Sequence, residues 1–401
     1  MDDAEEARTI GWTLWRIRDE RGKSLRVVGE LAGMGKDTLN RIERGLRSPT
    51  LTQLHALADA LQISVSELTR LPVPAPANGH TDSTIEAIRR ALDAIEFGHP
   101  GGMVLPLTML RDRVVRADAQ LRACRFAELA MDLPGLMRDL HTTLGTGNAE
   151  HHREVLALGV RLHVHVVRMW LNQAFASLDL RRQVVSVAHR LAHSHGDPAQ
   201  VGVAAFGIAD VLSVNGGLDS ARAVLDDLTL PSATRDTAGL LVSLLCVRGM
   251  MAVVDGRSAG ATAPLESAAE LAAHFGEYPD DPLGFASGPT SVAFRQARIA
   301  LEAGDPERAV SIAREVNPMD NPFPASRVYH WVGYGRGLAQ LPGHDGDAVQ
   351  VLRTAEKIHP HRVLRDPFVR DTLAVLLRRS RRGSPVDQEL RGMARRAGFS
   401  V

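Results

Sequence analysis

Six side chains between residues 36 and 44 combine hydrogen-bonding groups with positive charge at helical spacing. They are Lys36, Asp37, Thr38, Asn40, Arg41 and Arg44. Leu39 and Ile42, three residues apart, form the apolar side of the same segment, so the polar side chains fall on its free face. Short polar groups and long cations on such a face can hydrogen-bond the base edges of a major groove. The chemistry that these residues indicate is recognition of double-stranded DNA.

The preceding residues predict the elements that must position this helix. Ser24 is a favourable N-cap for a short helix, in which Val28 and Leu31 are expected on the apolar side. Residues 32–34 predict a tight turn, and Gly29 leaves room for the second helix to cross closely. The sequence therefore predicts two helices joined by a turn, with the second one exposed.

The strings Ile42–Gly45 and Ser48–Leu51, in this order and at this spacing, resemble the XRE/Cro-repressor class of helix-turn-helix domains. The resemblance covers roughly Ile10 to Leu71 and implies a lambda-repressor-like domain of five helices. We expect helices at Ile10–Arg21, from Ser24, from about Gly35, at Thr50–Leu61 and at Val65–Leu71. Glycine at the recognition-helix N-cap and Leu25 in place of a polar residue depart from the family pattern.

The resemblance also implies roles for individual side chains. The base-reading positions correspond to Lys36, Asp37 and Arg41, whereas Thr38, Asn40 and Arg44 suit phosphates or neighbouring edges. Arg47 lies in the loop that follows the backbone or a minor groove, and Ser24 begins a helix whose N–H groups would meet a phosphate. Arg18 and Glu43 match a pair that forms an internal salt bridge in the class. A domain repurposed for protein contacts is the alternative.

The charge distribution supports DNA binding locally. The whole chain is neutral, with 47 basic and 47 acidic residues. Residues 8–50, however, carry ten Lys and Arg against five Asp and Glu, a net charge of +5. Because one such domain contacts few base pairs, we expect a homodimer on an inverted repeat.

Composition and length predict a helical chain of two domains. A chain of 401 residues exceeds the size of one small domain, and strand patterns are sparse. Cys124 and Cys246 lie in apolar stretches and are expected as reduced core residues. No leader pattern and no bilayer-length apolar stretch is expected, so we predict a cytoplasmic protein, nucleoid-associated when bound to DNA, that does not use a membrane.

Alternating prolines mark a boundary between the two predicted domains. We expect the DNA-binding domain at 1–71, a Pro-rich linker at 72–81 and a helical repeat domain at 82–401. From about Leu105 onward, paired helices follow one another roughly every 35–50 residues. The long first helices are expected at Leu107–Met131, Ala149–Ser177, Pro198–Val214, Asp236–Val254, Pro289–Ala303, Pro324–Leu341 and Asp366–Arg379. The second helices are expected at Leu133–Leu144, Leu180–His193, Leu218–Leu228, Ala263–Phe275, Pro306–Val316, Asp347–Ile358 and Pro385–Ala397.

The segment Ala297–Pro318 resembles a tetratricopeptide (TPR) repeat, with Gly304–Ala309 as its inter-helix turn. The resemblance implies an α-solenoid of helical hairpins that senses a ligand or partner and dimerises; a non-repetitive bundle is the alternative. A helix-turn-helix domain joined to such an array is similar to the quorum-sensing, peptide-sensing RRNPP regulators of Gram-positive bacteria. It is also similar to a large set of actinobacterial regulators.

Polar side chains on the long helices suit a ligand's amides and carboxylate. The candidates are Arg168, Asn172, Gln173, Asn215, Arg248, Arg295, Gln296, Tyr334 and Arg336. Arg168 and Asn172 share one helical face beside Trp170 and Phe175 and are the first set to test. For each arginine alone, a solvated or salt-bridged surface group is the alternative.

Neither catalysis nor a bound cofactor is expected. No phosphate-binding glycine loop, nucleophile motif or paired carboxylates occur, and the sixteen histidines lack partners at metal-site spacing. We therefore predict a sequence-specific transcriptional regulator that is not an enzyme, modulated by a peptide, small molecule or protein partner. The alternative is a TPR scaffold that sequesters a partner protein, with the helix-turn-helix domain only localising it.

Overall fold

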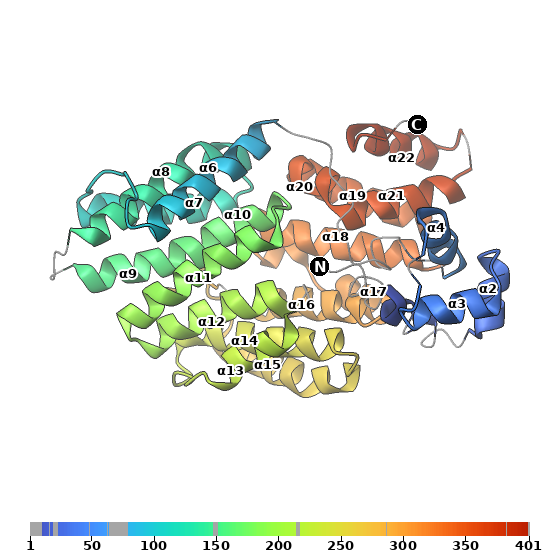
Figure 1. Cartoon of the computed structure of the whole chain (residues 1–401), viewed down its shortest axis with the longest axis horizontal. Coiled ribbons are helices and arrows are strands. Elements are labelled where there is room, and N and C mark those ends of the chain that lie inside the picture. Colours follow the sequence, from blue (N-terminus) through green and yellow to red (C-terminus); the bar gives the residue numbers. More distant parts are fainter. Residues whose placement is uncertain are drawn as a thin grey trace. The chain divides into compact units, whose positions relative to one another are not determined.

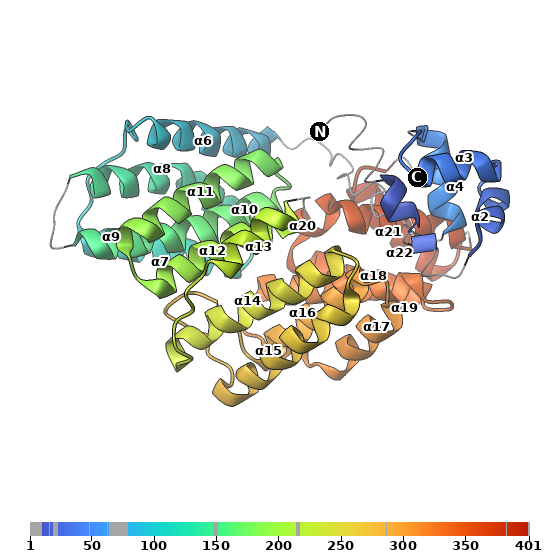
Figure 2. The same ribbon diagram turned by 60° about the horizontal axis from the view of Figure 1, so that its bottom comes forward.

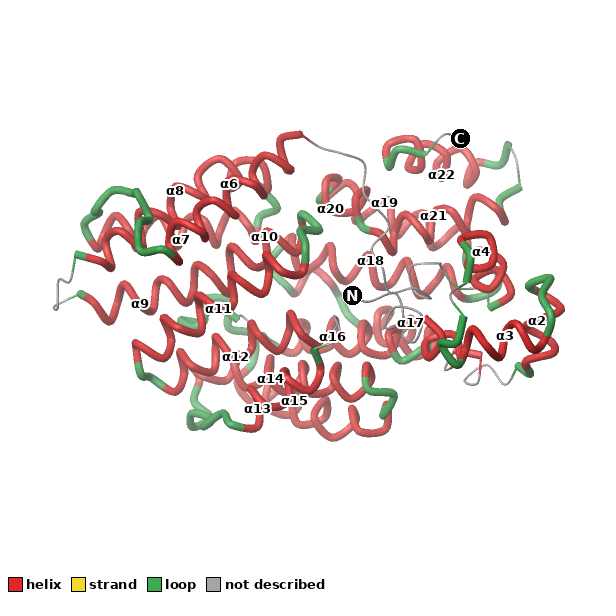
Figure 3. Tube along the Cα trace, viewed as in Figure 1, coloured by secondary structure: helices red, strands yellow, loops and turns green. Residues whose placement is uncertain are grey.

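The computed structural model describes residues 10–15, 17–18, 23–47, 49–61, 63, 79–146, 151–213, 217–285, 287–381 and 383–399. Across these ranges the chain forms helices and connecting loops without a strand, which confirms the all-α prediction (Figure 3). The chain divides into two compact units. The first unit comprises Met1–Pro76, Gly304–Val310 and Trp331–Val401, and the second comprises Ala77–Ala303 and Ser311–His330. The predicted helix Val65–Leu71 and most of the predicted linker lie outside the described residues.

The amino-terminal residues of the first unit form a small helical cluster. Residues 10–15 and 17–18 are helical and are followed by α2 (Leu25–Leu31), α3 (Lys36–Glu43) and α4 (Leu51–Ala60) (Figure 1). Their shared core contains the fully buried side chains of Leu14, Val28, Leu39, Ile42 and Leu57. Ser24 caps α2, and Thr50 forms a capping box with Gln53 at α4. The predicted helix-turn-helix pattern is thus present, with α3 as the second helix.

Two details of this cluster differ from the sequence-based expectation. The sequence predicts Val28 and Leu31 on the apolar side of α2. Val28 is fully buried, but Leu31 is 61% exposed. A Cβ at Gly29 would lie 2.8 Å from the Met34 carbonyl oxygen, so this glycine makes room for the turn itself. The close helix crossing occurs instead at Gly11, where a Cβ would lie 2.3 Å from the Ile42 carbonyl oxygen.

The second unit is an array of helices joined by short loops. Its helices are α6 (Gly79–Glu96), α7 (Leu107–Arg122), α8 (Phe126–Gly145), α9 (His152–Arg161), α10 (Arg168–Gln173), α11 (Leu178–His195), α12 (Pro198–Ser213), α13 (Leu218–Asp226), α14 (Arg235–Val254), α15 (Thr262–Phe275) and α16 (Pro289–Glu302). α11 packs against α9 and α12, and α12 also packs against α13 and α14 (Figure 2). α14 then packs against α15 and α16, so sequence neighbours are also spatial neighbours. This arrangement is the hairpin array that the sequence predicts.

The boundary between the two units passes through α17 (Pro306–Glu315) and α18 (Pro324–Gln340). The first unit is completed by α19 (Asp345–Ile358), α20 (Pro360–Arg365), α21 (Pro367–Arg379) and α22 (Pro385–Arg396). Asp366 separates α20 from α21 and caps the latter by accepting from the Phe368 and Val369 N–H groups. Glu356 on α19 accepts from Arg396 on α22 at 2.5 and 3.0 Å, which ties the two helices together.

One predicted helix boundary is wrong. The sequence predicts helices Leu107–Met131 and Leu133–Leu144 with a break between them, but α8 runs from Phe126 to Gly145 without a break and contains Pro134. The break lies at Cys124, which has a positive φ of 60°. A proline within a helix removes only one backbone hydrogen bond and kinks the helix. Here the buried face of α8 includes Leu133 and Leu136 and holds the helix together across that position.

The helix α14 corrects the expectation about bilayer-length apolar stretches. It is 20 residues long and reaches a mean hydropathy of 2.0, so by length and composition it could cross a membrane. In the structure 67% of that window is buried inside the protein. Leu240, Val242 and Ser243 are among its completely or nearly completely buried residues. α14 is therefore a central core helix of the second unit.

Candidate functional site

The exposed face of α3 carries the side chains that the sequence predicts to contact DNA. Lys36, Asp37 and Arg41 are exposed, while Thr38 and Asn40 are half-buried. Leu39, Ile42 and Glu43 occupy the opposite, buried side. Gly35 provides no side-chain cap, as expected from its type. α3 therefore presents a polar face to the outside and is held on its other side by the apolar Leu39 and Ile42 together with the buried Glu43.

The five charged side chains of this face and of the residues just after α3 are unpaired among the described residues. The side chains of Lys36, Asp37, Arg41, Arg44 and Arg47 make no hydrogen bond or ion pair with any residue in the described part of the chain. Unpaired cations on an exposed helix remain free to pair with phosphates, and their entry into a groove breaks no internal bond. Ser24 is exposed at the start of α2, where its Oγ accepts from the Val27 N–H at 3.3 Å.

A buried ion pair braces the recognition helix from behind. The Arg18 guanidinium donates to Glu43 through Nε at 2.6 Å and through Nη2 at 3.0 Å. The two side chains are only 11% and 4% exposed. Arg18 also donates to the Lys23 carbonyl oxygen at 2.8 Å. The pair joins the first helix to the end of α3, which is the structural role that the family resemblance implies for it.

Comparison with known proteins agrees with this geometry. The family described as a helix-turn-helix domain matches residues 9–71. The HTH-type transcriptional regulator y4dJ of Sinorhizobium fredii is 36% identical over 61 residues, which cover 15% of this chain and 79% of that protein. The chain belongs to the helix-turn-helix transcriptional regulators. The apo competence regulator ComR of Streptococcus vestibularis is similar at 14% identity over 70% of this chain and 95% of its own, with a TM-score of 0.19. A likeness at that score supports no statement about fold or ligand.

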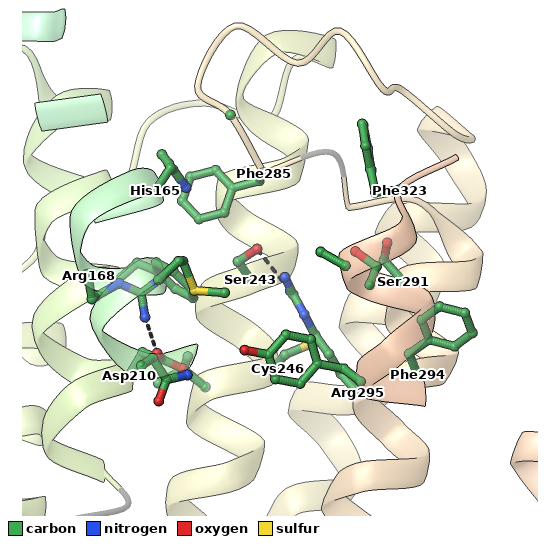
Figure 4. A pocket seen from close by; sticks show the side chains of 18 of the residues that line it. His165, Arg168, Asp210, Ser243, Cys246, Phe285, Ser291, Phe294, Arg295 and Phe323 are labelled. Carbon is green, nitrogen blue, oxygen red and sulfur yellow. Dashed lines mark hydrogen bonds and ion pairs between the residues drawn. The ribbon is translucent and has the colours of Figure 1, made fainter. Parts of the chain in front are cut away.

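The second unit of this regulator encloses a pocket of about 280 Å³. Its walls come from α7, the segment Leu162–Val167, α10, α12, α14, α16, the first turns of α18 and the loop around Phe285. Figure 4 shows Arg168 and Arg295 on different walls, with Ser243 and Cys246 of α14 between them. A cavity with walls from many separate helices and a few convergent polar groups is the usual form of a small-ligand site.

The wall formed by α10 depends on an unusual backbone. Leu162–Val167 is a π-helix that joins α9 to α10 without interrupting the helical run. Such segments shift the direction of the following side chains and occur frequently at functional sites. His165 and Arg168 both line the pocket, and Arg168 Nε donates to the Val164 carbonyl oxygen at 2.9 Å.

Two of the pocket arginines are neutralised by carboxylates. Arg122 Nε contacts Asp118 at 2.9 Å, and Arg168 forms an ion pair with Asp210. Burial alone would raise the pKa of Asp118, but Arg122 and Arg161 hold that pKa below its usual value, so the carboxylate stays ionised. These pairs stabilise the walls and leave no free acidic group among them.

The arginines of α16 are in a different situation. Arg295 Nη1 donates to Ser243 Oγ at 2.9 Å, and this hydroxyl also lies 3.0 Å from Ser287 Oγ. Arg295 has no carboxylate partner among the described residues. Arg298, one turn further along, is exposed and makes no hydrogen bond or ion pair anywhere in the described ranges. The α16 wall therefore carries uncompensated positive charge.

Four phenylalanine side chains contribute to the remaining lining. Phe206, Phe285, Phe294 and Phe323 line the pocket, four of the ten phenylalanines in the chain. Phe285 meets Phe206 edge-to-face at 5.0 Å and His165 at 4.8 Å. Burial lowers the pKa of His165 to about 3, so its ring is neutral at pH 7 and behaves as a further aromatic wall.

The structure brings four of the nine predicted ligand residues into this pocket. They are Arg168, Asn172, Gln173 and Arg295. Arg248 and Gln296 instead bond the carbonyl oxygens of Leu225 and Leu265, away from the pocket. Tyr334 and Arg336 belong to the first unit, and Asn215 lies outside the described residues. Trp170, expected beside Arg168, is fully buried and stacks on Phe126 at 4.6 Å.

Sequence reasoning missed Arg122, Arg298 and the four phenylalanines. They come from α7, α12, α16 and two loops, in segments as far apart in sequence as Arg122 and Phe323, so periodicity within one helix carries no sign that they meet. No group of three or more His, Cys, Asp or Glu side chains is placed to hold a metal ion within the ranges that the structure describes. Cys246, in the pocket wall, and Cys124 are both free thiols.

Proposed function

We propose that this regulator binds a specific operator through α3, which enters a major groove. The observation that carries the proposal is the exposed face of α3, whose charged groups are unpaired while the buried ion pair of Arg18 and Glu43 fixes the helix. In this proposal Lys36, Asp37 and Arg41 contact base edges, because they lie on the outermost part of the face. Thr38, Asn40, Arg44, Arg47 and the α2 start at Ser24 contact phosphates or neighbouring edges and set the orientation.

The regulator acts as a homodimer in the cytoplasm on an inverted-repeat operator. A single recognition helix of eight residues reaches few base pairs, which is too little information to select one site in a genome. Two heads related by a twofold axis double the site and match a palindrome. The array of hairpins in the second unit offers helical surfaces for such an assembly.

A ligand in the pocket of the second unit adjusts DNA binding. It does so by binding one arrangement of the protein more tightly than another, since only differential affinity shifts an equilibrium. The pocket supports this role because it combines a cavity, aromatic walls and uncompensated charge in a part of the chain that the DNA-binding face does not use.

The test is sequencing of genomic fragments retained by the purified full-length protein, followed by salt-titrated mobility shifts on the enriched site. We expect one palindromic motif with half-sites about one helical turn apart. Arg41→Ala should weaken the enriched site and relax its sequence preference. Arg90→Ala, at an exposed arginine of α6, is the matched control and should leave binding unchanged. Recovery of fragments without a shared motif would refute the proposal.

A further inference from the structure

We infer that the pocket of the second unit binds a compact carboxylic acid with an apolar, ring-sized body, and that Arg295 receives its carboxylate. The inference rests on the proposed ligand-responsive function and names the chemical class of ligand for that same pocket. It is carried by the charge balance of the walls, by their aromatic side chains and by the engagement of both side-chain amides of the lining within the protein.

The charge balance of the walls favours an anionic ligand. The pocket is lined by four arginines, Arg122, Arg168, Arg295 and Arg298, but by only two acidic residues, Asp118 and Asp210. Both carboxylates are already engaged by Arg122 and Arg168. The positive charge of the α16 wall therefore remains uncompensated. A guanidinium offers five N–H donors in a planar fork that matches a carboxylate, so Arg295 keeps donors for a bound acid beyond its bond to Ser243.

The phenylalanine side chains of the lining indicate that the ligand has an apolar, ring-sized body. Phe206 and Phe285 close one side of the cavity and Phe294 and Phe323 another. The guanidinium carbon of Arg168 lies 5.3 Å from the centre of the Phe206 ring, and that of Arg122 lies 4.5 Å from the centre of the Phe323 ring. These two arginines, already paired with carboxylates, therefore pack on aromatic rings as part of the wall. Burial of an apolar ring among these side chains makes the free energy of binding more favourable in proportion to the apolar area removed from water.

The side-chain amides of the lining, which could pair with both the N–H and the C=O groups of an extended peptide, are already engaged within the protein. A peptide presents one donor and one acceptor on nearly every residue, and these need partners when they are buried. The amide side chains of the lining are Asn172 and Gln173. Asn172 accepts from Arg181 at 3.3 Å, and Gln173 is 1% exposed and engaged in a contact within the protein. A cavity of about 280 Å³ also suits a compact molecule.

The test compares acids with their uncharged amides on the full-length protein. Benzoate, 3-phenylpropanoate and naphthalene-2-carboxylate, with the corresponding carboxamides, are titrated by calorimetry. The three pairs span a range of ring sizes while changing only the charged group. We expect at least one acid to bind, and its amide to bind about tenfold more weakly or worse, because hydrogen bonds to a charged group are stronger than neutral ones.

Three variants assign the carboxylate site. Arg295→Gln should remove the difference between acid and amide, whereas Arg298→Gln should reduce it only a few-fold because an exposed charge is screened. Arg248→Gln, at an exposed arginine of α14 outside the pocket, is the matched control and should retain the full difference. If circular dichroism shows that Arg295→Gln has lost its fold, the exposed Arg298→Gln variant and the acid–amide comparison decide the matter.

Each remaining outcome contradicts the inference. Equal binding of acid and amide, no binding by any of the three acids, or retention of the difference in Arg295→Gln would overturn it. So would tight binding of a random hexapeptide pool that Arg295→Gln leaves unchanged. DNA binding is measured separately without acid, so failure of the ligand class leaves the operator result standing. Acid binding without any effect on DNA would instead refute the proposed regulation.

Discussion

Removal of the charge of Glu43 should loosen α3 without changing the exposed face that we propose to contact DNA. Glu43→Gln keeps the shape of the side chain but leaves the nearly buried Arg18 guanidinium without its carboxylate. Breaking a buried ion pair by removing one partner costs about 3–5 kcal/mol. Because Arg18 retains its bond to the Lys23 carbonyl oxygen, we expect the lower end, about 3 kcal/mol. This is a large fraction of the stability of a small domain.

Hydrogen–deuterium exchange measures the effect locally. Amides of α3 in full-length Glu43→Gln should exchange about a hundredfold faster than in the parent protein, because exchange follows the free energy of local opening. Operator affinity should fall in parallel. Glu30→Gln is the matched control: Glu30 lies 3.5 Å from Arg26 in a pair whose side chains are 69% and 79% exposed, and such pairs contribute little. Arg18→Met combined with Glu43→Leu should restore protection, since no buried charge remains. Unchanged exchange of α3 in Glu43→Gln would refute the bracing role.

Three further outcomes are expected. Arg41→Ala should cost about 1–3 kcal/mol of operator affinity and relax specificity at one base pair, as measured by mobility shifts on operator variants, and an unchanged profile would contradict the placement of α3. Burial lowers the pKa of His163 to about 4 and that of His165 to about 3, against about 6.5 in the unfolded chain. Both rings are therefore neutral when folded, and protons bind the unfolded chain first as the pH falls below 6.5. The free energy of unfolding is therefore not reduced by these histidines above pH 6.5, and it falls progressively between pH 6.5 and pH 4. At pH 5 the loss is about 2 kcal/mol per histidine. Urea unfolding at pH 7 and pH 5 measures this loss, and equal midpoints would argue against burial of the two rings. Gly239→Ala would place a Cβ 2.0 Å from Asp281 Oδ2 and displace the loop that carries Phe285. Acid binding should weaken several-fold in that variant while DNA binding persists, whereas unaltered calorimetric affinity would exclude the loop from the pocket.

The recognition helix could be predicted from sequence because its signals are local. The spacing of Leu39 and Ile42, the weak cap at Gly35 and the Ser24 cap each act within one or two turns, and the structure contains all of them. The predicted bounds Pro306–Val316 and Asp347–Ile358 likewise lie within two residues of α17 and α19. The prediction that Leu31 faces the core is wrong. α2 has only seven residues, so the spacing of its apolar residues does not define a buried side, which depends on contacts with the other helices.

The ligand pocket could be predicted only in part. Arg168 and Asn172 share one helix, so their common face follows from their spacing of four residues. Their meeting with Arg295 and Phe323 depends on how α10, α14, α16 and α18 pack, which no periodicity within one helix encodes. The same holds for the break at Cys124, where the backbone rather than a recognisable residue pattern ends α7. Tertiary packing decides these features.

One wall of the pocket depends on the number of residues in the π-helical segment Leu162–Val167 more than on the identity of its valines. Its wider turn accommodates an additional residue relative to an α-helix. Loss of a single codon there would remove the extra residue and restore the ordinary pitch, which would change the side chains that the segment directs into the pocket, beginning with His165. Conservative replacements of the valines should be tolerated in evolution and in mutagenesis, whereas in-frame deletions of one residue should be selected against.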